Sequence, residues 1–296
     1  MRFLILGVTG MAGHMLAIYL REQGHYVAGT HRSSGCLVDY LSELGVETIS
    51  LDVRDDDALA SVIRESESDA VVNCIGLLNK DCDSLPDLAI YLNSYLPYRL
   101  LGLCEQCDKR LIHISTDCVF AGNGGPYSED SFPDGRSLYD RSKALGEISR
   151  KGHLTLRQSI IGPDPDPKGI GLLNWFMQQT DFVNGWTKAI WTGLTTLELA
   201  KAVEKCAFER VDGLVNMVPD CPGISKYDLL LLFSKYICAS AIDVRAVDGL
   251  RLDKSLVRRN RVSSYIPKGY SQQIVELSSW IKSHIELYPH YNIEAY

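Results

Sequence analysis

Short apolar runs alternate with longer amphipathic stretches through the first half of the chain. We predict strands for the apolar runs at residues 2–6, 26–30, 47–51, 70–74, 110–115 and 153–159. The stretches between them have helical patterns. Strands that are apolar almost throughout are covered on both faces, which is typical of a parallel sheet. The pattern therefore predicts an α/β fold with a doubly wound parallel sheet, a Rossmann domain.

The pattern changes after Ile161. A Pro- and Gly-rich loop, "GPDPDPKG", follows at residues 162–169. Beyond it, we predict helices at 172–179, 195–209 and 225–236, with strands near Trp191 and at 214–218. We therefore expect a Rossmann domain over residues 1–160 and a smaller C-terminal lobe over 161–296. Within that lobe, we expect residues 187–218 to return to the first sheet.

Composition excludes several classes of protein. With 46% hydrophobic and 23% charged residues, the 296-residue chain is ordinary for a globular protein. Its 30 basic and 37 acidic residues give a net charge of −7, which argues against a general nucleic-acid-binding surface. No apolar run approaches the roughly 20 residues that cross a bilayer. The N-terminal run "FLIL" ends in a glycine turn, so we interpret it as a buried strand and expect a cytoplasmic protein.

The nine cysteines are scattered along the chain. In a reducing compartment they are most simply free thiols. Cys104 and Cys107 form a CxxC, but no second pair follows, and the segment has the pattern of a helix end. We predict no zinc or redox site there and no other metal site.

Three glycines stand directly after the first strand, in "LILGVTGMAGHML". Gly7, Gly10 and Gly13 fit a tight turn, close approach of a pyrophosphate, and close packing of a helix on a strand. The N-terminus of the following helix would offer unpaired N–H groups and partial positive charge to the phosphates. This strand, turn and helix context predicts a dinucleotide site.

The end of the second strand indicates which dinucleotide binds. An NAD site typically places an acid about 20 residues on, for the ribose 2′-hydroxyl. Here Arg32 occupies that region, and the first acid is Asp39. An arginine pairs with a 2′-phosphate, so we predict NADPH in preference to NADH, with His31 and Ser33 as additional contacts. A solvated surface arginine is the alternative.

A candidate catalytic pair lies in "SLYDRSK". Tyr139 and Lys143 are four residues apart, which puts them on one face of a helix. An ammonium group there would favour phenolate over phenol and so lower the pKa of the tyrosine. By itself, the spacing equally fits a surface pair on an amphipathic helix.

Several motifs in order carry a family resemblance. With the glycine turn come "LD" at 51–52, "NCIG" at 73–76, "STDCVF" at 115–120 and "YDRSK" at 139–143. Up to about residue 218, the chain resembles the extended short-chain dehydrogenase/reductases, in particular the dTDP-4-dehydrorhamnose reductase group, which reduces 4-keto sugar nucleotides. The implied cofactor-binding residues are Gly7, Thr9, Gly10, Met11 and Ala12 at the pyrophosphate, Asp52 and Val53 at the adenine, and Cys74, Ile75 and Gly76 along the ribose and diphosphate.

The resemblance also implies the chemistry. Tyr139 would donate a proton to the sugar carbonyl, Thr116 would orient that carbonyl, and Lys143 would bind the nicotinamide ribose and lower the pKa of Tyr139. Asp117 and Cys118 would lie beside the substrate. Cys118 stands where sugar-nucleotide 4,6-dehydratases have a glutamate, so dehydration is not expected. These parts imply NADPH-dependent reduction of a nucleotide-linked 4-keto-6-deoxy sugar, for surface polysaccharide.

Two other functions stay open. Related epimerase-reductases pair a cysteine at the position of Cys118 with a later histidine, but no histidine occurs between His153 and His284. This fold also includes NADP(H)-binding regulatory subunits without catalysis, although such a binder does not need Thr116, Tyr139 and Lys143 together.

The C-terminal lobe should supply partners for the substrate diphosphate. Asn174 resembles the asparagine that extended family members place there. The segment 250–261 has five Lys/Arg and one Asp, so it could bind phosphates or form a solvated helix face. Trp175, Trp186 and Trp191 could stack on a sugar or a base, although core positions are more usual for tryptophan. We also consider a homodimer.

Overall fold

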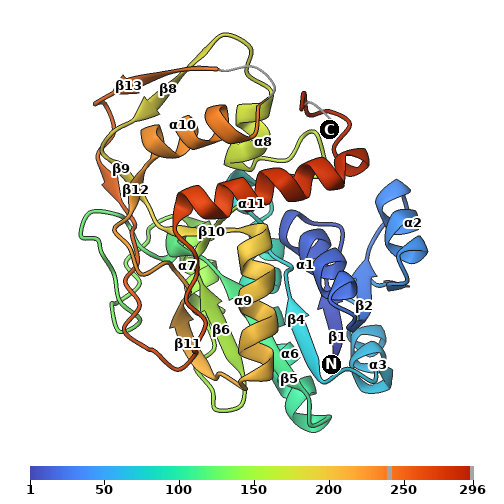
Figure 1. Ribbon diagram of the computed structural model, residues 1–296. Coiled ribbons are helices and arrows are strands. Elements are labelled where there is room, and N and C mark those ends of the chain that lie inside the picture. The colour runs from blue at the N-terminus through green and yellow to red at the C-terminus, as the bar shows by residue number, and fades with distance from the viewer. Residues whose placement is uncertain (239–241, 294–296) are drawn as a thin grey trace.

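A seven-stranded parallel sheet forms the centre of the first half (Figure 1). The computed structural model describes residues 1–238 and 242–293. The strand order is β11-β6-β5-β4-β1-β2-β3, and every neighbouring pair is parallel. The strands are β1 (Arg2–Leu6), β2 (Tyr26–His31), β3 (Glu47–Ser50), β4 (Ala70–Asn73), β5 (Arg110–Ser115), β6 (Leu154–Arg157) and β11 (Gly213–Asn216). The predicted doubly wound fold is confirmed.

Helices cover both faces of this sheet, because alternate strand residues point to opposite sides. Phe3 and Ile5 of β1 pack in one apolar cluster with α1 and α9, whereas Leu4 and Leu6 pack in another with α3 and α6. The helices of this half are α1 (Met11–Glu22), α2 (Cys36–Glu43), α3 (Asp56–Glu65), α4 (Asn79–Ser84), α5 (Pro86–Ile90), the π-helical turn η1 (Tyr91–Tyr95), α6 (Leu96–Gln106), the 3₁₀ turn η2 (Asp117–Val119), α7 (Leu138–Leu145) and α9 (Thr196–Phe208).

The C-terminal half adds three small sheets. Their pairings are β10 with β7, β13 with β8, and the order β12-β9-β14. The strands are β7 (Ser159–Ile161), β8 (Phe182–Trp186), β9 (Ala189–Trp191), β10 (Gly193–Thr195), β12 (Ile224–Ser225), β13 (Asp243–Val247) and β14 (Leu252–Asp253). The helices are α8 (Leu172–Met177), α10 (Lys226–Tyr236), α11 (Tyr270–Ser283) and the 3₁₀ turn η3 (Ile285–Leu287).

The single strand predicted at 153–159 is two strands. β6 ends at Arg157, and β7 begins at Ser159 and pairs with β10 outside the large sheet. Gln158 lies between them, is 1% exposed, and has no hydrogen-bond partner for its side chain within the described residues. The chain thus leaves the sheet at its carboxyl edge. Local hydrophobicity could not reveal this, because leucine or isoleucine residues lie on both sides of the break.

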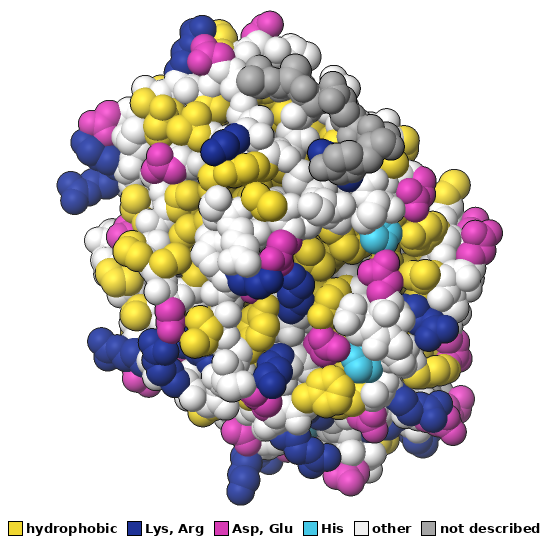
Figure 2. Space-filling view, viewed as in Figure 1, with side chains coloured by type: hydrophobic (Ala, Val, Ile, Leu, Met, Phe, Trp, Pro, Cys, Tyr) yellow, Lys and Arg dark blue, Asp and Glu magenta, His cyan; other side chains and the backbone are white. Residues whose placement is uncertain are grey.

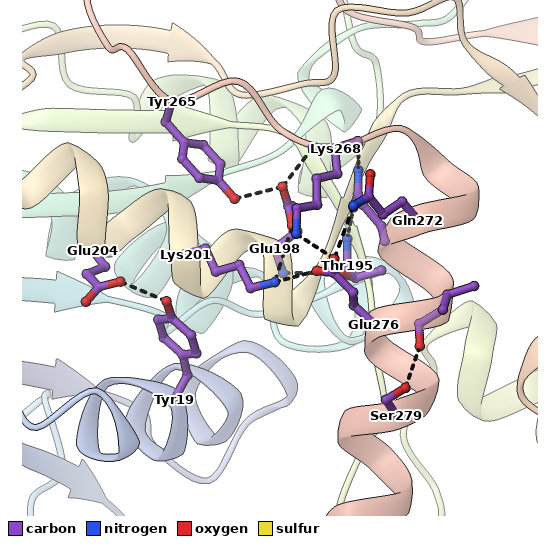
Figure 3. Close-up of polar contacts among 12 residues, drawn as sticks. Tyr19, Thr195, Glu198, Lys201, Glu204, Tyr265, Lys268, Gln272, Glu276 and Ser279 are labelled. Atoms are coloured by element: carbon purple, nitrogen blue, oxygen red, sulfur yellow. Dashed lines mark hydrogen bonds and ion pairs between the residues drawn. The ribbon is translucent and has the colours of Figure 1, made fainter.

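Helix α9 joins the two halves through polar contacts (Figure 3). Tyr19 of α1 donates a 2.8 Å hydrogen bond to Glu204 of α9, and Lys201 of α9 forms a 2.6 Å ion pair with Glu276 of α11. The buried Glu198 accepts a hydrogen bond from the Tyr265 hydroxyl at 2.7 Å. These contacts fix the helix that covers the α1 face of the sheet.

The surface mixes charges. On the face drawn in Figure 2, Lys and Arg side chains are interspersed with Asp and Glu. In the described part of the chain, no helix combines the length and apolar character needed to cross a membrane. All nine cysteines are free thiols, and Cys107 follows the last turn of α6, as predicted.

Candidate active site and cofactor cleft

The glycine turn lies at the carboxyl end of β1, and its geometry requires glycine at two positions. Gly7 has φ of +85°, which other residues rarely adopt. A Cβ atom on Gly13 would lie 2.0 Å from the carbonyl oxygen of Gly7. Gly10, the residue before α1, is exposed, and the nearest atom to a Cβ there would be 3.6 Å away. The backbone is therefore open to a ligand where α1 begins, which fits a pyrophosphate.

A cleft follows this turn along the carboxyl edge of the sheet. It is lined by most of the predicted cofactor-binding residues, namely Gly7, Thr9, Gly10, His31, Arg32, Asp52, Val53, Cys74, Ile75 and Gly76. Met11 and Ala12 form the first turn of α1 and do not line it. Strands β1, β2 and β4 end together here, because Leu6 pairs with both Thr30 and Asn73. The residues present fit a dinucleotide.

One end of the cleft carries two arginines and one acid. Asp52 accepts hydrogen bonds from Nε of Arg54 at 3.0 Å and from Nη2 at 2.5 Å. These bonds lower the pKa of Asp52 to about 2, and the charge of Arg32 acts in the same direction. Arg32 is exposed, whereas His31 is buried. Arg54 also lines the cleft. The sequence analysis missed it because it looked for a phosphate-binding residue only at the end of the second strand, whereas Arg54 follows the third strand.

Helix α7 presents the candidate catalytic pair. A capping box starts this helix, with Ser137 bonded to the backbone N–H of Asp140 and the Asp140 carboxylate bonded to that of Ser137. Tyr139 and Lys143 are 9% and 5% exposed, so a solvated surface pair is excluded. Lys143 donates to the carbonyl oxygen of Ile114 at 2.9 Å. A Cβ on the cleft residue Gly76 would lie 3.9 Å from Lys143 Nζ, so the ammonium borders the cleft.

The predicted lowering of the Tyr139 pKa is wrong for the protein chain itself. Burial raises this pKa above its ordinary value, and the neighbouring Thr116 hydroxyl only partly opposes the rise. Lys143 is not among the main groups that shift it; its own pKa is lowered to about 8, chiefly by burial. Tyr139 is therefore a phenol at neutral pH, which is the form that donates a proton.

Asn93 is a site residue that the sequence analysis missed. It lies in the π-helical turn η1 and is fully buried. Its side chain bonds both backbone groups of Leu77, at 2.9 and 3.0 Å, and donates to the Ser142 hydroxyl at 3.0 Å. It thereby joins α7 to the segment after Gly76. A polar asparagine among the apolar and aromatic residues of this helical segment was the one sequence feature that could have indicated its role.

A buried ion pair supports α7 from the sheet. Arg157 of β6 contacts Glu147 through Nε at 2.8 Å and Nη2 at 2.5 Å, and the two side chains are 2% and 6% exposed. Ser115 donates to the same carboxylate at 2.7 Å. The guanidinium also lies over the Phe120 ring, 5.1 Å from its centroid. No local pattern of residues predicts this pair, since its members come from different elements.

Thr116, Asp117 and Cys118 follow β5 at the same edge of the sheet. The Thr116 hydroxyl accepts from the Cys118 N–H at 3.1 Å and donates to Asp117 at 3.2 Å. Burial raises the pKa of Asp117 and raises that of Cys118 to about 12. Cys118 is thus a neutral thiol rather than a base, which argues against the epimerase-reductase alternative.

Two expectations for the C-terminal half need correction. Asn174 is fully buried, and its amide donates to the carbonyls of Asp166, Pro167 and Gly169, so its side chain holds a loop and is not exposed to a ligand. The helix considered for residues 250–261 is also wrong, because the segment contains β14 and otherwise irregular backbone. Trp191 is buried in the core, whereas Trp175 and Trp186 are 41% and 43% exposed.

Comparison with known proteins agrees with this geometry. The model of the family described as RmlD substrate binding domain matches residues 1–161, more than half of the chain. The chain belongs to this family. This match makes the chain an RmlD-like extended short-chain dehydrogenase/reductase, as the motifs predicted.

Two relatives and one solved structure illustrate the likeness. The chain is 32% identical over 145 residues to the probable low-salt glycan biosynthesis reductase Agl14 of Haloferax volcanii, and 32% over 148 residues to a dTDP-4-dehydrorhamnose reductase of Streptomyces griseus. These matches cover 48% and 49% of this chain but only 46% and 43% of the relatives. The chain thus spans less than half the length of these two relatives.

The solved structure is a dTDP-4-dehydrorhamnose reductase from Bacillus anthracis in complex with NADP. It superposes with a TM-score of 0.75 over 93% of this chain and 98% of that one, at 17% identity. At this identity the likeness concerns the fold alone. The structural match extends beyond residues 1–161, which the family model matches.

Proposed function

We propose that this RmlD-like protein is an NADPH-dependent reductase of the 4-keto group of a nucleotide-linked 6-deoxy sugar. The observation that carries the proposal is the position of a buried, protonated Tyr139, which packs in one cluster with Leu77, a residue of the cleft that fits a dinucleotide. The named relatives are reductases, which supports the same reaction class.

Each residue of the candidate site has a defined role in this proposal. NADPH, when bound, would supply the hydride to the sugar carbon. The Gly7 turn and the N-terminus of α1 would bind its pyrophosphate. Tyr139 would donate its phenolic proton to the carbonyl oxygen as negative charge develops there, and the Thr116 hydroxyl would hold that oxygen in place. Lys143, beside Gly76, would bind the nicotinamide ribose.

Preference for NADPH over NADH is also part of the proposal. Arg32 and Arg54 both line the cleft at the ends of β2 and β3, where a 2′-phosphate would lie. Asp52 is not free to bind a ribose hydroxyl strongly, because its carboxylate is bonded to Arg54. Two guanidinium groups suit a phosphate better than a neutral hydroxyl.

The test is NADPH oxidation by the purified protein with 4-dehydro-6-deoxy sugars linked to dTDP, UDP and GDP. We expect turnover with one nucleotide class and loss of turnover in Tyr139→Phe. If the protein binds NADPH but turns over none of these substrates, the reductase proposal fails and a regulatory role gains support.

A further inference from the structure

Two hydrogen bonds join the turn η2 to the segment that leads into helix α7. The N–H of Gly135 donates to the carbonyl oxygen of Val119 at 2.9 Å. The N–H of Ala121 donates to the carboxylate of Asp134 at 2.8 Å. We call this pair of bonds the clasp. It brings together the two ends of a long loop, residues 122–133, that lies between η2 and α7 in the chain.

The clasp lies close in sequence to both groups that would act on the substrate carbonyl. Thr116 is the N-cap residue of η2, which ends at Val119. Tyr139 is the second residue of α7, in the turn that follows Gly135. Few backbone torsions separate the clasp from either hydroxyl. A change in the clasp would therefore move the two hydroxyls relative to each other.

The segment between the clasp and α7 is itself held by hydrogen bonds. The carboxylate of Asp140 accepts from the N–H groups of Arg136 and Ser137, each at 3.1 Å, and the Ser137 hydroxyl accepts from the N–H of Asp140 at 3.0 Å. A Cβ atom on Gly135 would lie 2.5 Å from Cβ of Asp140 and 2.8 Å from the carbonyl oxygen of Val119. Because this packing is so close, the start of α7 follows the clasp.

Apolar packing holds the turn against the same helix. Cys118 packs in one cluster with Tyr139, and the fully buried Val119 belongs to another cluster, against which Ala144 of α7 packs. The Thr116 hydroxyl accepts from the N–H of Cys118 at 3.1 Å, so the direction of this hydroxyl follows the turn. The clasp and the packing thus fix the same relationship, that of η2 to α7.

The loop enclosed by the clasp, residues 122–133, is bound to the C-terminal half of the chain. The N–H of Tyr127 donates to the carbonyl oxygen of Ser255 at 2.8 Å, and the Glu129 carboxylate accepts from the N–H of Arg259 at 3.0 Å. Any movement of the C-terminal half is therefore passed to this loop. The clasp lies between the loop and the candidate catalytic groups, so it can keep their geometry constant.

We propose that Asp134 is a positioning residue for proton transfer, which aligns the hydroxyls of Thr116 and Tyr139 on one carbonyl oxygen. This inference deepens the proposed function and rests on it. Reduction adds a hydride from NADPH to the carbonyl carbon and the phenolic proton of Tyr139 to the carbonyl oxygen, and the phenolate that remains takes a proton from water. Asp134 acts on this step through the position of the two hydroxyls.

The first test compares Asp134→Ala with Asp134→Asn, using the 4-dehydro-6-deoxy sugar nucleotide that the wild type reduces. The alanine variant loses the acceptor for the Ala121 N–H, so kcat should fall by about 10-fold to 100-fold, the effect of displacing a catalytic group by about 1 Å. The asparagine variant keeps an acceptor oxygen, so its kcat should be close to that of the wild type. The Kd for NADPH should be unchanged in both, since other residues line the cofactor cleft.

Two further measurements separate alignment from a general loss of stability. Asp212→Ala is the matched control, because the Asp212 carboxylate accepts from the N–H of Gly152 at 2.9 Å, near the amino ends of β6 and β11. It should lower the unfolding temperature about as much as Asp134→Ala does and leave kcat unchanged. In Asp134→Ala the solvent deuterium isotope effect on kcat should increase, because proton transfer limits turnover more strongly.

Hydrogen–deuterium exchange without ligands tests the clasp independently of turnover. The amides of Ala121 and Gly135 should exchange faster in Asp134→Ala than in the wild type, and at the wild-type rate in Asp134→Asn. Unchanged exchange in the alanine variant would overturn the inference. So would a wild-type kcat in Asp134→Ala, or a loss of kcat that Asp134→Asn shares.

Failure of the proposed function has a different signature. A wild-type protein that turns over none of the sugar nucleotides would remove the reductase proposal and, with it, the role of Asp134 in proton transfer. Faster exchange of the two amides in Asp134→Ala would in that case still assign the link between η2 and α7 to Asp134.

Discussion

His14 and Tyr288 are joined by a 2.7 Å hydrogen bond, although 274 residues separate them in the chain. His14 lies in the first turns of α1, and its Nδ1 lies 3.0 Å from the carbonyl oxygen of Gly10. A carbonyl only accepts, so Nδ1 carries the proton and Nε2 accepts from the Tyr288 hydroxyl. The last segment of the chain thus holds the helix whose N-terminus borders the cofactor cleft.

This contact predicts how stability depends on pH. Burial lowers the pKa of His14 to about 4 from an ordinary value near 6.5. Between these two values the unfolded chain binds more protons than the folded one, so the free energy of unfolding should fall as pH drops from 6.5 towards 4. Urea unfolding at several pH values measures this. In His14→Gln the dependence should be shallower, and an unchanged slope would contradict the assignment.

Tyr139→Phe tests the proton donor. Removing the hydroxyl should lower kcat by roughly 100-fold to 10,000-fold, the usual contribution of general acid catalysis. NADPH affinity, measured by fluorescence titration, should change little because the ring remains packed. A variant that keeps wild-type turnover would show that another group donates the proton.

Arg32→Ala tests the choice of cofactor. The dissociation constant for NADPH should rise by about 10-fold to 100-fold, and that for NADH should stay nearly constant, because only NADPH has the 2′-phosphate. Arg54→Ala should act in the same direction. Arg99→Ala is the matched control, since Arg99 pairs with Asp56 outside the residues that line the cleft. Equal losses for both cofactors would rule out a 2′-phosphate contact.

Glu147→Gln tests the buried ion pair. It leaves the guanidinium of Arg157 buried without a counter-charge, so the free energy of unfolding should fall by about 3 to 5 kcal/mol. Glu105→Gln breaks the exposed pair with Arg150 and should cost no more than about 1 kcal/mol. Chemical denaturation of both variants gives the comparison. Similar small losses in the two would mean that Arg157 finds another partner.

Local features of the chain were readable from the sequence. Most strands of the large sheet are buried on both faces, and that pattern is a property of consecutive residues. The turn at Gly7, Gly10 and Gly13 is equally local, because it depends on the backbone of a few neighbouring residues. The four-residue spacing of Tyr139 and Lys143 placed them on one helix face for the same reason.

The sequence by itself determined the α/β fold, the glycine turn and the helical pair, since hydrogen bonding and burial within each element depend on nearby residues. Only the tertiary structure decided the rest. Burial raised the pKa of Tyr139, Glu147 found Arg157 on another element, and Asn174 turned inward to a loop. Such contacts join segments distant in the chain, so they exist only once the chain has folded.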